Sequence, residues 1–388
     1  MNIGFDAKKA IVNLTGIGNY SRRVVAALSR EYPDAGLFLF GPRRQPETIL
    51  PEAANIRRVY PPAFGGAVTY ELWRNRFLRG DLRKYGIDIY HGLSNEIPTG
   101  LRRSATRTVV TIHDLIFLTR PETFKPGMRL KLRKKTLYAC RNADRIIAIS
   151  RQTADDIVRF YDIDRDRIDI VYQSIDPLFF DEVPEAVRTS VRARYSLPAR
   201  YVLCVGTIEK RKNQELLIKA LPDIGHDIHV VIVGRRTPYA DELEALARKT
   251  GVSRRVHIIS GVPTGDLPAI YQEAETFCFP SVYEGFGLPI AEALASRVPV
   301  IASTGSCLEE AGGPDSVYIA PDDHAGLAEA VNRIAGDSDL RNRITQRGAE
   351  YVVRFSDEAM ARGLMRVYNS VMLTDNRNAE GFNTPDHI

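Results

Sequence analysis

Short apolar, β-branched runs alternate along the chain with longer stretches in which apolar residues recur at helical spacing. The first series of runs lies at residues 2–6, 37–40, 88–91, 108–112, 145–149 and 168–172. The second series lies at residues 201–206, 228–234, 256–260, 276–280, 298–302 and 317–320. Because strands that alternate with helices form parallel sheets, the pattern predicts an α/β protein with two doubly wound, Rossmann-like domains.

A polar stretch at residues 181–200 separates the two series; it contains Pro184 and Pro198 and no strand run. In open α/β sheets ligands bind at the carboxyl ends of the strands, so we expect the functional site between the two domains. The predicted organisation is an N-terminal domain at residues 1–180, a C-terminal domain at residues 181–356, a crossover helix at residues 357–373 that returns to the first domain, and a flexible tail at residues 374–388.

Length and composition agree with this organisation. The 388 residues exceed the roughly 250 to 300 that one hydrophobic core supports. The chain is 44% hydrophobic and 26% charged, has no apolar run near the roughly 18 residues of a membrane span, and begins without a secretory signal. A cytoplasmic location is therefore expected. The cysteines are far apart in sequence, which favours buried thiols over a metal or redox site: Cys140, Cys204, Cys278 and Cys307.

Charge is divided unevenly along the chain. Residues 1–180 contain 30 Lys and Arg against 19 Asp and Glu, a net charge of +11, whereas the remainder carries −6. The excess is concentrated in two clusters, Arg74, Arg76, Arg79, Arg83 and Lys84, and Arg129, Lys131, Arg133, Lys134 and Lys135. The clusters are interpreted either as two solvated helix faces or as a surface that contacts anionic lipid head groups. Nucleic acid is disfavoured as a partner because no helix-turn-helix, zinc-finger or RNP-type pattern accompanies the charge.

The most specific motif is FPSVYEGFGLPIAEALAS, in which Glu284 and Glu292 flank a glycine-containing turn. This turn follows a predicted strand and opens a helix, so its free backbone N–H groups predict an anion site suited to a diphosphate. A glycosidase pair is rejected, because eight helical residues span about 12 Å and such pairs stand about 5 to 9.5 Å apart. Separate binding roles, one near a sugar and one on a vicinal diol such as ribose, fit the spacing better.

A second motif, VGTIEKRKNQELLIKA, places Arg211 and Lys212 after the strand that ends at Gly206. Cations at this position predict neutralisation of the charge on a departing phosphate. Asn213 is the expected N-cap of the following helix. In a third loop, the backbone of residues 260–262 is a candidate to read the edge of a nucleobase.

Together with SGVPTGDLPAIYQEAETFCFPSVYEGFGLPIAEALA and VPVIASTGSCLEE, these motifs resemble the family 4 retaining glycosyltransferases, which have the GT-B fold. The resemblance extends over nearly the whole chain. In the first half, the family's glycine loop matches residues 16–20, and its strand-end His-Asp pair matches His113 and Asp114. Thr207 departs from the pattern, because many members have Arg there; this places more of the phosphate neutralisation on Arg211 and Lys212.

The resemblance implies roles for individual residues. Arg211 and Lys212 would bind the donor diphosphate, Glu284 would touch the transferred sugar and Glu292 would hold the donor ribose. His113 joins Arg211, Lys212 and Glu284 as an expected catalytic residue. The other expected donor-binding residues are Gly206, Thr207, Ser260, Gly261, Val262, Phe286, Gly287, Leu288, Ser306 and Glu310. The other expected acceptor-side residues are Gly16, Ile17, Gly18 and Asp114.

The expected reaction is metal-independent, retaining transfer of a hexose from a nucleotide sugar, with no cofactor. The VGTIE-x-RKN form resembles bacterial mannosyltransferases of surface polysaccharide assembly, which implies GDP-mannose as donor. Together with the positive charge of the first domain, this resemblance implies a saccharide or polyprenyl-diphosphate-linked acceptor. It also implies that the protein lies peripherally on the inner face of the cytoplasmic membrane. The sequence leaves open a UDP-sugar-dependent transferase, an epimerase or phosphorylase of the same fold, and a non-catalytic nucleotide-sugar-binding subunit. A dehydrogenase is disfavoured, because no GxGxxG opens a helix after a strand.

Overall fold

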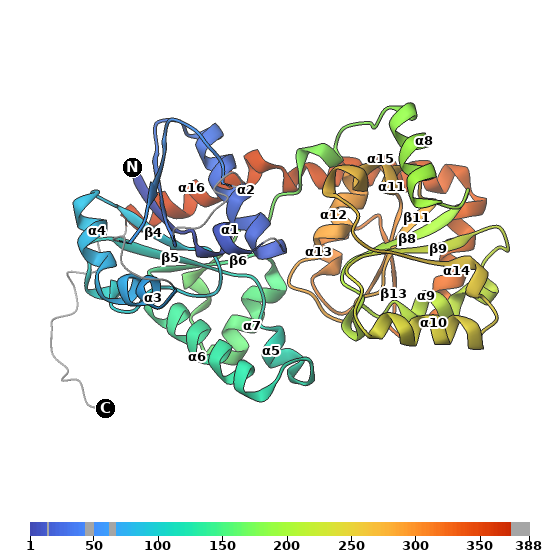
Figure 1. Ribbon diagram of the computed structural model, residues 1–388, viewed down its shortest axis with the longest axis horizontal. Helices are drawn as coiled ribbons and strands as arrows, with labels where there is room; N and C mark the ends of the chain where they lie inside the picture. Colours follow the sequence, from blue (N-terminus) through green and yellow to red (C-terminus); the bar gives the residue numbers. More distant parts are fainter. Residues whose placement is uncertain (14, 43–49, 62–66, 374–388) are drawn as a thin grey trace.

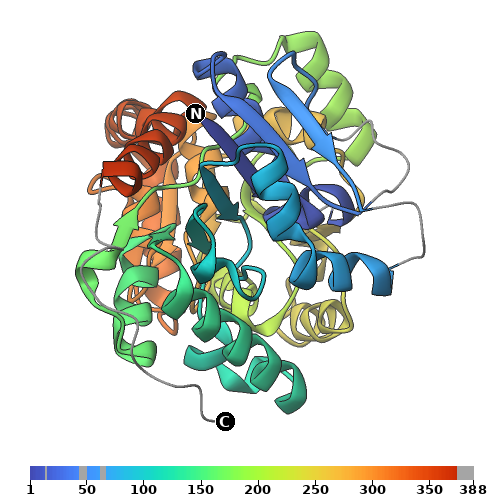
Figure 2. The same ribbon diagram turned by 90° about the vertical axis from the view of Figure 1, so that its left-hand side faces the viewer.

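The computed structural model describes residues 1–13, 15–42, 50–61 and 67–373, and they form two parallel sheets with helices packed around them (Figure 1). In the first sheet the strand order is β3-β2-β1-β4-β5-β6-β7. Its strands are β1 (Asn2–Asp6), β2 (Gly36–Phe40), β3 (Ile56–Val59), β4 (Ile89–Gly92), β5 (Arg107–Ile112), β6 (Arg145–Ala148) and β7 (Ile168–Ile170). Helices cover both faces of this sheet, as the view from its end shows (Figure 2).

The second sheet has the order β10-β9-β8-β11-β12-β13, again with parallel neighbours. Its strands are β8 (Tyr201–Val205), β9 (His229–Val233), β10 (Val256–Ile259), β11 (Thr276–Phe279), β12 (Val300–Ser303) and β13 (Val317–Ile319). In both sheets the strand order reverses direction beside the first strand, which is the switch point where such sheets bind ligands.

The helices follow the strands in regular alternation. Those of the first half are α1 (Lys8–Val12), α2 (Gly16–Glu31), α3 (Ala67–Arg76), α4 (Leu78–Lys84), α5 (Ile116–Thr119), α6 (Pro126–Asn142) and α7 (Arg151–Tyr161). Those that follow are α8 (Glu185–Tyr195), α9 (Glu215–Ala220), α10 (Tyr239–Lys249), α11 (Leu267–Gln272), α12 (Leu288–Ala295), α13 (Leu308–Gly312), α14 (His324–Gly336), α15 (Ser338–Val352) and α16 (Asp357–Leu373). In the described part of the chain, none of them is long and apolar enough to cross a membrane.

The predicted fold class, two doubly wound Rossmann-like domains, is confirmed. Each expected strand forms, with its ends within two residues of the prediction. Strand β3 was not predicted, because Arg57 and Arg58 interrupt its apolar pattern. This strand lies at the sheet edge, where arginine side chains reach solvent at little cost. The four cysteines are free and buried, as their spacing predicted.

The stretch expected to be a linker contains a helix. α8 occupies its centre and packs against α11. Before it, Ile175 and Phe179 already lie in the core of the second half, together with Val191 of α8. The low hydrophobicity of α8 concealed it, because only a narrow stripe of this surface helix is buried. The predicted tail at residues 374–388 lies outside the described residues.

Helix α16 crosses from the second half back to the first, where it packs against α2 (Figure 1). Met360, Leu364 and Tyr368 are buried in the core of the first half. The Tyr368 hydroxyl lies 2.7 Å from Nδ1 of His91 on β4. The two halves are thus joined by two chain crossings, which restrict how they can move relative to each other.

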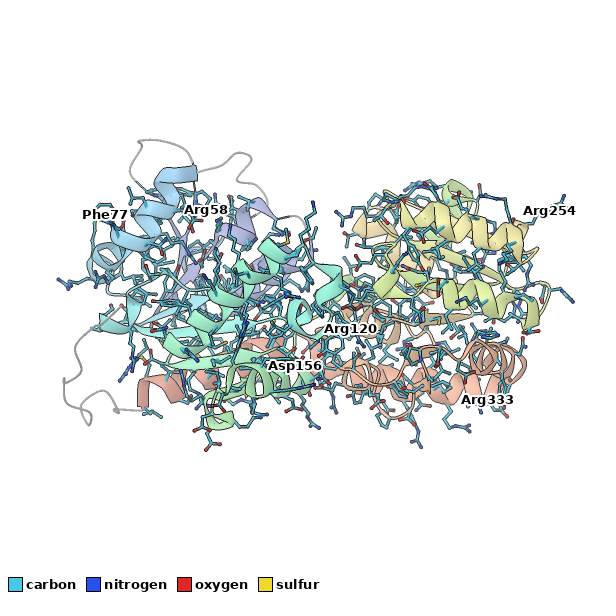
Figure 3. The ribbon with its side chains drawn as sticks, turned by 90° about the horizontal axis from the view of Figure 1, so that it is seen from below. Arg58, Phe77, Arg120, Asp156, Arg254 and Arg333 are labelled. Atoms are coloured by element: carbon cyan, nitrogen blue, oxygen red, sulfur yellow. The ribbon has the colours of Figure 1, made fainter. Side chains whose placement is uncertain are left out.

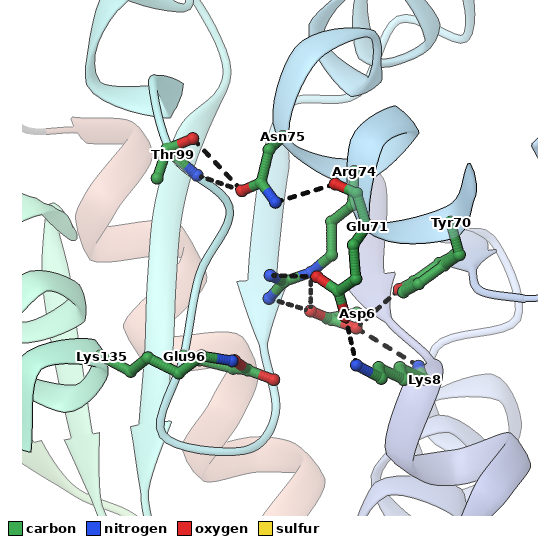
Figure 4. Close-up of polar contacts among 9 residues, drawn as sticks. All are labelled: Asp6, Lys8, Tyr70, Glu71, Arg74, Asn75, Glu96, Thr99 and Lys135. Carbon is green, nitrogen blue, oxygen red and sulfur yellow. Dashed lines mark hydrogen bonds and ion pairs between the residues drawn. The ribbon is translucent and has the colours of Figure 1, made fainter. Parts of the chain in front are cut away.

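A buried ion pair organises the carboxyl end of β1 (Figure 4). The Asp6 carboxylate accepts hydrogen bonds from Arg74 Nε at 2.8 Å and Nη2 at 2.6 Å, and from the Tyr70 hydroxyl at 3.2 Å. Beside it, Lys8 pairs with Glu71. Arg74 is only 4% exposed. For Arg74 both readings of the basic cluster, a solvated helix face and a lipid-facing surface, are therefore wrong: Arg74 neutralises a buried carboxylate inside the domain.

Candidate active site

Arg211 and Lys212 lie in a short 3₁₀ turn after the carboxyl end of β8. The Lys212 Nζ lies 2.7 Å from Glu284 Oε1 and 4.8 Å from the centre of the Phe279 ring. Gly206 directly follows the strand, with φ +149°, and a Cβ there would lie 3.6 Å from Lys212 Cε. That distance is an ordinary van der Waals contact, so glycine is favoured at this position by its positive φ and not by lack of space. Arg211 and Lys212 both lie at the carboxyl end of the second sheet.

Asn213 has a role other than the expected N-cap. It adopts the left-handed conformation, with φ +56°, and α9 begins two residues later with Gln214 as its N-cap. The Asn213 side-chain amide donates to the carbonyls of Pro280 at 3.1 Å and Pro321 at 2.7 Å. Asn213 thus ties the basic turn to the ends of the neighbouring strands, which fixes the positions of Arg211 and Lys212.

Glu284 joins the 3₁₀ turn that carries Arg211 and Lys212 to the glycine-containing turn at residues 285–287. Its Oε1 accepts hydrogen bonds from Lys212 Nζ at 2.7 Å and from the Ser281 hydroxyl. It also forms an ion pair with Arg211 Nη1, at 2.7 Å. Burial alone would raise the pKa of Glu284, but the two cations lower it below its usual value. Glu284 is therefore ionised at neutral pH and acts as counter-ion to the two cations.

The glycine-containing turn at residues 285–287 presents backbone N–H groups that have no hydrogen-bond acceptor in the described part of the chain. Gly287 has φ +106°, a conformation that favours glycine, and it is the N-cap of α12. Pro289 follows in the first turn of this helix, where its lack of an N–H group costs nothing. Among the described residues, the backbone N–H groups of Phe286, Gly287 and Leu288 have no hydrogen-bond acceptor. These donors, together with the positive end of the α12 dipole, suit an anion.

Glu292 lies one turn further along α12. Its Oε2 accepts a hydrogen bond from the Tyr271 hydroxyl at 3.0 Å. Burial raises the pKa of Glu292 to about 7. The carboxyl group is therefore close to half-ionised at neutral pH, and a diol that donates to it would favour the charged form.

The raised pKa predicts a pH-dependent effect of Glu292→Gln on stability. The folded-state pKa of about 7 lies above the model-peptide value of 4.5, so stability is highest below the lower value and falls as the pH rises through the higher one. Glutamine cannot ionise. We expect its melting temperature to exceed that of the wild type by about 2 °C near pH 8.5 and to match it near pH 5. Calorimetry at both pH values measures this; an equal difference at both would contradict it.

His113 lies at the carboxyl end of β5 and is buried. Its Nε2 lies 2.8 Å from the Leu93 carbonyl oxygen, so this nitrogen carries the proton and Nδ1 is left as an acceptor. Burial lowers the pKa of His113 to about 4, and the ring is neutral at physiological pH. Tyr20 packs edge-on against it at 4.7 Å. Asp114 follows, and burial raises its pKa above the usual value.

The glycines expected to form an acceptor-side loop begin a helix instead. Gly16, Ile17 and Gly18 form the first turn of α2, after the N-cap residue Thr15. A Cβ on Gly18 would lie 1.7 Å from the Asn13 carbonyl oxygen, so this position requires glycine for close packing against α1. The turn precedes Tyr20, and through that residue it supports His113.

The remaining expected donor-binding residues lie at strand ends around the same edge of the second sheet. Thr207 follows β8, and its carbonyl accepts from the Gln214 side chain at 3.0 Å. Ser260, Gly261 and Val262 follow the edge strand β10, where the Ser260 hydroxyl donates to the Gly234 carbonyl at 2.7 Å. Ser306 follows β12 and precedes Cys307, whose thiol donates to the Glu284 carbonyl at 3.2 Å. The side chains of Thr207, Ser260, Val262 and Ser306 have no described contact with Glu284, Arg211 or Lys212.

Sequence reasoning missed the contacts that join the two halves. The Tyr283 hydroxyl donates to Asp156 of α7, and the Arg120 guanidinium stacks on the Tyr283 ring at 5.7 Å. The Thr153 hydroxyl lies 3.4 Å from the Gly285 carbonyl. Arg120 and Asp156 stand at the junction between the halves (Figure 3). The only signal in the sequence was Ser150, a typical N-cap residue after a strand, which marks the start of α7 at the sheet's carboxyl edge.

Two Rossmann-like halves, with cations and free N–H groups gathered at the strand ends of the second half, are the architecture of a glycosyltransferase of the GT-B fold. Two family models match the chain: "Glycosyltransferase Family 4" at residues 14–178 and "Glycosyl transferases group 1" at residues 192–351. Together they match both halves. The chain belongs to the family 4 glycosyltransferases.

Relatives agree with this assignment, and solved structures share the fold. The chain is 29% identical to O-antigen chain mannosyltransferase B of Escherichia coli, over 95% of this chain and 99% of that protein. It is 31% identical to D-inositol 3-phosphate glycosyltransferase of Xylanimonas cellulosilytica, over 58% of this chain and 57% of the relative. The fold matches sucrose-phosphate synthase from Thermosynechococcus elongatus with a TM-score of 0.76 and 21% identity, over 96% and 99% of the two chains. It also matches Anabaena HepE, solved with UDP and glucose, at 0.73 and 17% identity, over 95% and 100%.

Proposed function

We propose that the protein is a metal-independent, retaining hexosyltransferase that transfers mannose from GDP-mannose to a saccharide or lipid-linked saccharide. The observation that carries the proposal is the convergence of Arg211 and Lys212 on Glu284, beside the free N–H groups at the start of α12. Mannose as the transferred sugar is supported by the full-length similarity to an O-antigen chain mannosyltransferase.

The site supplies what the bond cleavage requires. When the bond between the sugar C1 and the diphosphate oxygen breaks, negative charge grows on the phosphate and positive charge on the sugar ring. Arg211, Lys212 and the N–H groups of Gly287 and Leu288 would stabilise the departing phosphate, usually the largest contribution to catalysis. Glu284, already ionised, would face the sugar. The departing phosphate oxygen would take the proton of the acceptor hydroxyl, and Arg211 and Lys212 would supply the positive charge that a metal provides in metal-dependent transferases.

The nucleoside and the acceptor would bind on opposite sides of the bond that is cleaved. Glu292 would accept hydrogen bonds from the ribose hydroxyls, and the backbone of residues 260–262 would border the base. Neutral His113 would present its Nδ1 as a hydrogen-bond acceptor toward the acceptor side. Because the ring is already neutral, we expect turnover between about pH 6 and 8 to be independent of His113 titration.

Nucleotide binding tests the donor assignment. A ligand that binds only the folded protein at 100 times its Kd adds about 2.7 kcal/mol of stability, so the melting temperature rises by several degrees. We expect this rise with GDP and GDP-mannose and a smaller one with the UDP and ADP species. A rise with UDP species alone would contradict mannose as the transferred sugar, while the assignment as a transferase would stand. Turnover of the donor without acceptor would indicate an epimerase, and no rise with any nucleotide would contradict the donor site.

The surface of the first half supports an acceptor at a membrane. Helix α6 exposes Met128 and Leu130, with Arg129, Lys131 and Lys134 exposed around them. In the described part of the chain, Lys131 and Lys134 have no ion-pair partner, whereas Lys135 pairs with Glu96. Exposed apolar side chains among cations suit an anionic lipid surface, and this helix follows the His113 strand end. A polyprenyl-diphosphate-linked acceptor would be presented from such a surface.

Vesicle binding tests this surface. Each cation near an anionic membrane contributes about 1 kcal/mol, so the double variant Lys131→Ala, Lys134→Ala should bind phosphatidylglycerol vesicles about tenfold or more weakly. The control variant Arg248→Ala, Lys249→Ala removes the same charge from the exposed end of α10 and should bind as the wild type does. Equal sedimentation of both variants, or equal binding of the wild type to phosphatidylcholine, would contradict a specific electrostatic contact.

A further inference from the structure

The carboxylate of Glu310, a residue of α13, caps a helix of the other half of the molecule. Its Oε2 accepts a hydrogen bond from the backbone N–H of Arg151 at 2.8 Å, and its Oε1 accepts one from Gln152 at 3.1 Å. These two N–H groups open α7. The hydroxyl of Tyr172, in the segment after β7, adds a third hydrogen bond to Oε2 at 3.2 Å.

This cap completes the start of α7. The third free N–H group of the helix, from Thr153, is bonded at 3.0 Å to the hydroxyl of Ser150, the helix's own N-cap. Glu310 supplies acceptors for the first two. A carboxylate at a helix N-terminus is favoured by the helix dipole, and a hydrogen bond from N–H to a charged acceptor is about twice as strong as one to a neutral acceptor.

The first turn of α7 is also where the two halves of the molecule meet beside the candidate active site. The Thr153 hydroxyl lies 3.3 Å from the His113 carbonyl and 3.4 Å from the Gly285 carbonyl. One turn further on, Asp156 accepts the hydrogen bond from Tyr283. The strand end at His113 and the glycine-containing turn at residues 285–287 are therefore both held against the first turn of α7. Glu310 fixes the orientation of that helical turn.

We infer that Glu310 is a positioning residue, which holds the two halves in the closed arrangement needed for transfer and does not bind the donor. The inference rests on the proposed function in one respect, that transfer takes place between the halves. Three of the four lone-pair directions of its carboxylate are already used within the protein. The groups proposed to bind the donor, Arg211, Lys212 and Glu292, all belong to the second half.

This role and a donor-binding role predict opposite kinetics. If Glu310 only positions the halves, its loss leaves nucleotide affinity unchanged and lowers turnover, because a displacement of about 1 Å at a reacting centre costs about a hundredfold in rate. If Glu310 binds the donor, its loss weakens nucleotide affinity. The arrangement of the halves is the second readout, since a donor contact would leave it unchanged.

The test compares Glu310→Gln with the control Glu309→Gln. Glutamine keeps the size of the side chain but turns an N–H group toward the backbone donors of α7, whereas the neighbouring Glu309 side chain is exposed. For Glu310→Gln we expect a GDP dissociation constant within twofold of the wild type, turnover lowered about ten- to hundredfold, and a larger radius of gyration in X-ray scattering. Glu309→Gln should match the wild type in all three.

Two results would overturn the inference: a weaker GDP affinity in Glu310→Gln with unchanged turnover at saturating donor, or an unchanged radius of gyration. Should that variant fail to fold, Tyr172→Phe removes one hydrogen bond to the same carboxylate and should change turnover and radius in the same direction, to a smaller extent. The scattering comparison requires no substrate. A wild-type protein that binds no nucleotide would therefore count against the proposed function, while the radii would still decide the role of Glu310.

Discussion

Replacing Lys212 with methionine is expected to lower kcat by about a hundred- to a thousandfold, the cost of removing one preorganised donor from a developing oxyanion. The Lys212 ammonium lies 2.7 Å from the Glu284 carboxylate, at the carboxyl end of β8. Methionine keeps most of the side-chain volume that packs on Phe279, so the loss is chiefly one of charge. Arg211 remains, and its contact with Glu284 keeps the carboxylate ionised.

The control for this prediction is Lys210→Met, in the same turn. Lys210 is exposed; it forms a surface pair with Glu242 at 3.4 Å, and its Nζ lies 5.8 Å from the centre of the Tyr239 ring. Surface pairs of this kind contribute little, so the control should keep nearly full activity. Steady-state kinetics on both variants would decide the matter. Equal activities would show that the charge of Lys212 has no part in departure of the phosphate.

Gly285→Ala is expected to abolish transfer almost completely, for a reason of space. A Cβ at this position would lie 2.4 Å from the His113 carbonyl oxygen and 3.2 Å from the Asp114 Cβ. The obstacle at His113 is backbone from the other half of the molecule, so it cannot swing aside. The two halves must separate, and the donor-side loop then no longer meets the acceptor-side strand end. A separation of about 1 Å is enough to cost about a hundredfold in rate.

The matched control is Gly265→Ala, where an added Cβ meets no atom within 4 Å. Its activity should be unchanged, and so should the nucleotide affinity of both variants, since the proposed donor-binding groups move together. Retained transfer in Gly285→Ala would mean that the closed arrangement of the halves is not the reactive one. Loss of nucleotide binding as well would place the defect in the second half.

The two-domain fold could be predicted from the sequence because strand runs buried on both faces give continuous apolar segments. The edge strand β3 and the surface helix α8 were not predicted, because their apolar residues do not form a continuous segment. Each is exposed on one side, so charged residues such as Arg57 and Arg194 dilute the pattern that marks an element. Asn213 was misplaced because a residue type favoured at N-caps is also favoured in the left-handed conformation, and the sequence alone does not distinguish the two.

The site was predictable where it is local in sequence and obscure where it is not. Glu284, Gly287 and Glu292 belong to one strand-turn-helix unit, so their spacing carried the prediction. The contact of Lys212 with Glu284 spans 72 residues and could be inferred only from strand ends that meet at one edge. Glu310 reaches Arg151 across 159 residues and two domains, and no local pattern records such a contact. Resemblance had placed that glutamate on the donor side.

The most direct test of metal-independent, retaining transfer is the anomeric configuration of the product. GDP-mannose would be incubated with a polyprenyl-diphosphate-linked saccharide in excess EDTA, and the new linkage would be read by NMR. The α-configuration of the donor should be kept in the product, at a rate that EDTA does not change. A β-linked product would contradict the retaining mechanism, in which Glu284 faces the sugar and the departing phosphate takes the acceptor proton. Loss of transfer in EDTA would show that Arg211 and Lys212 do not suffice to neutralise the phosphate.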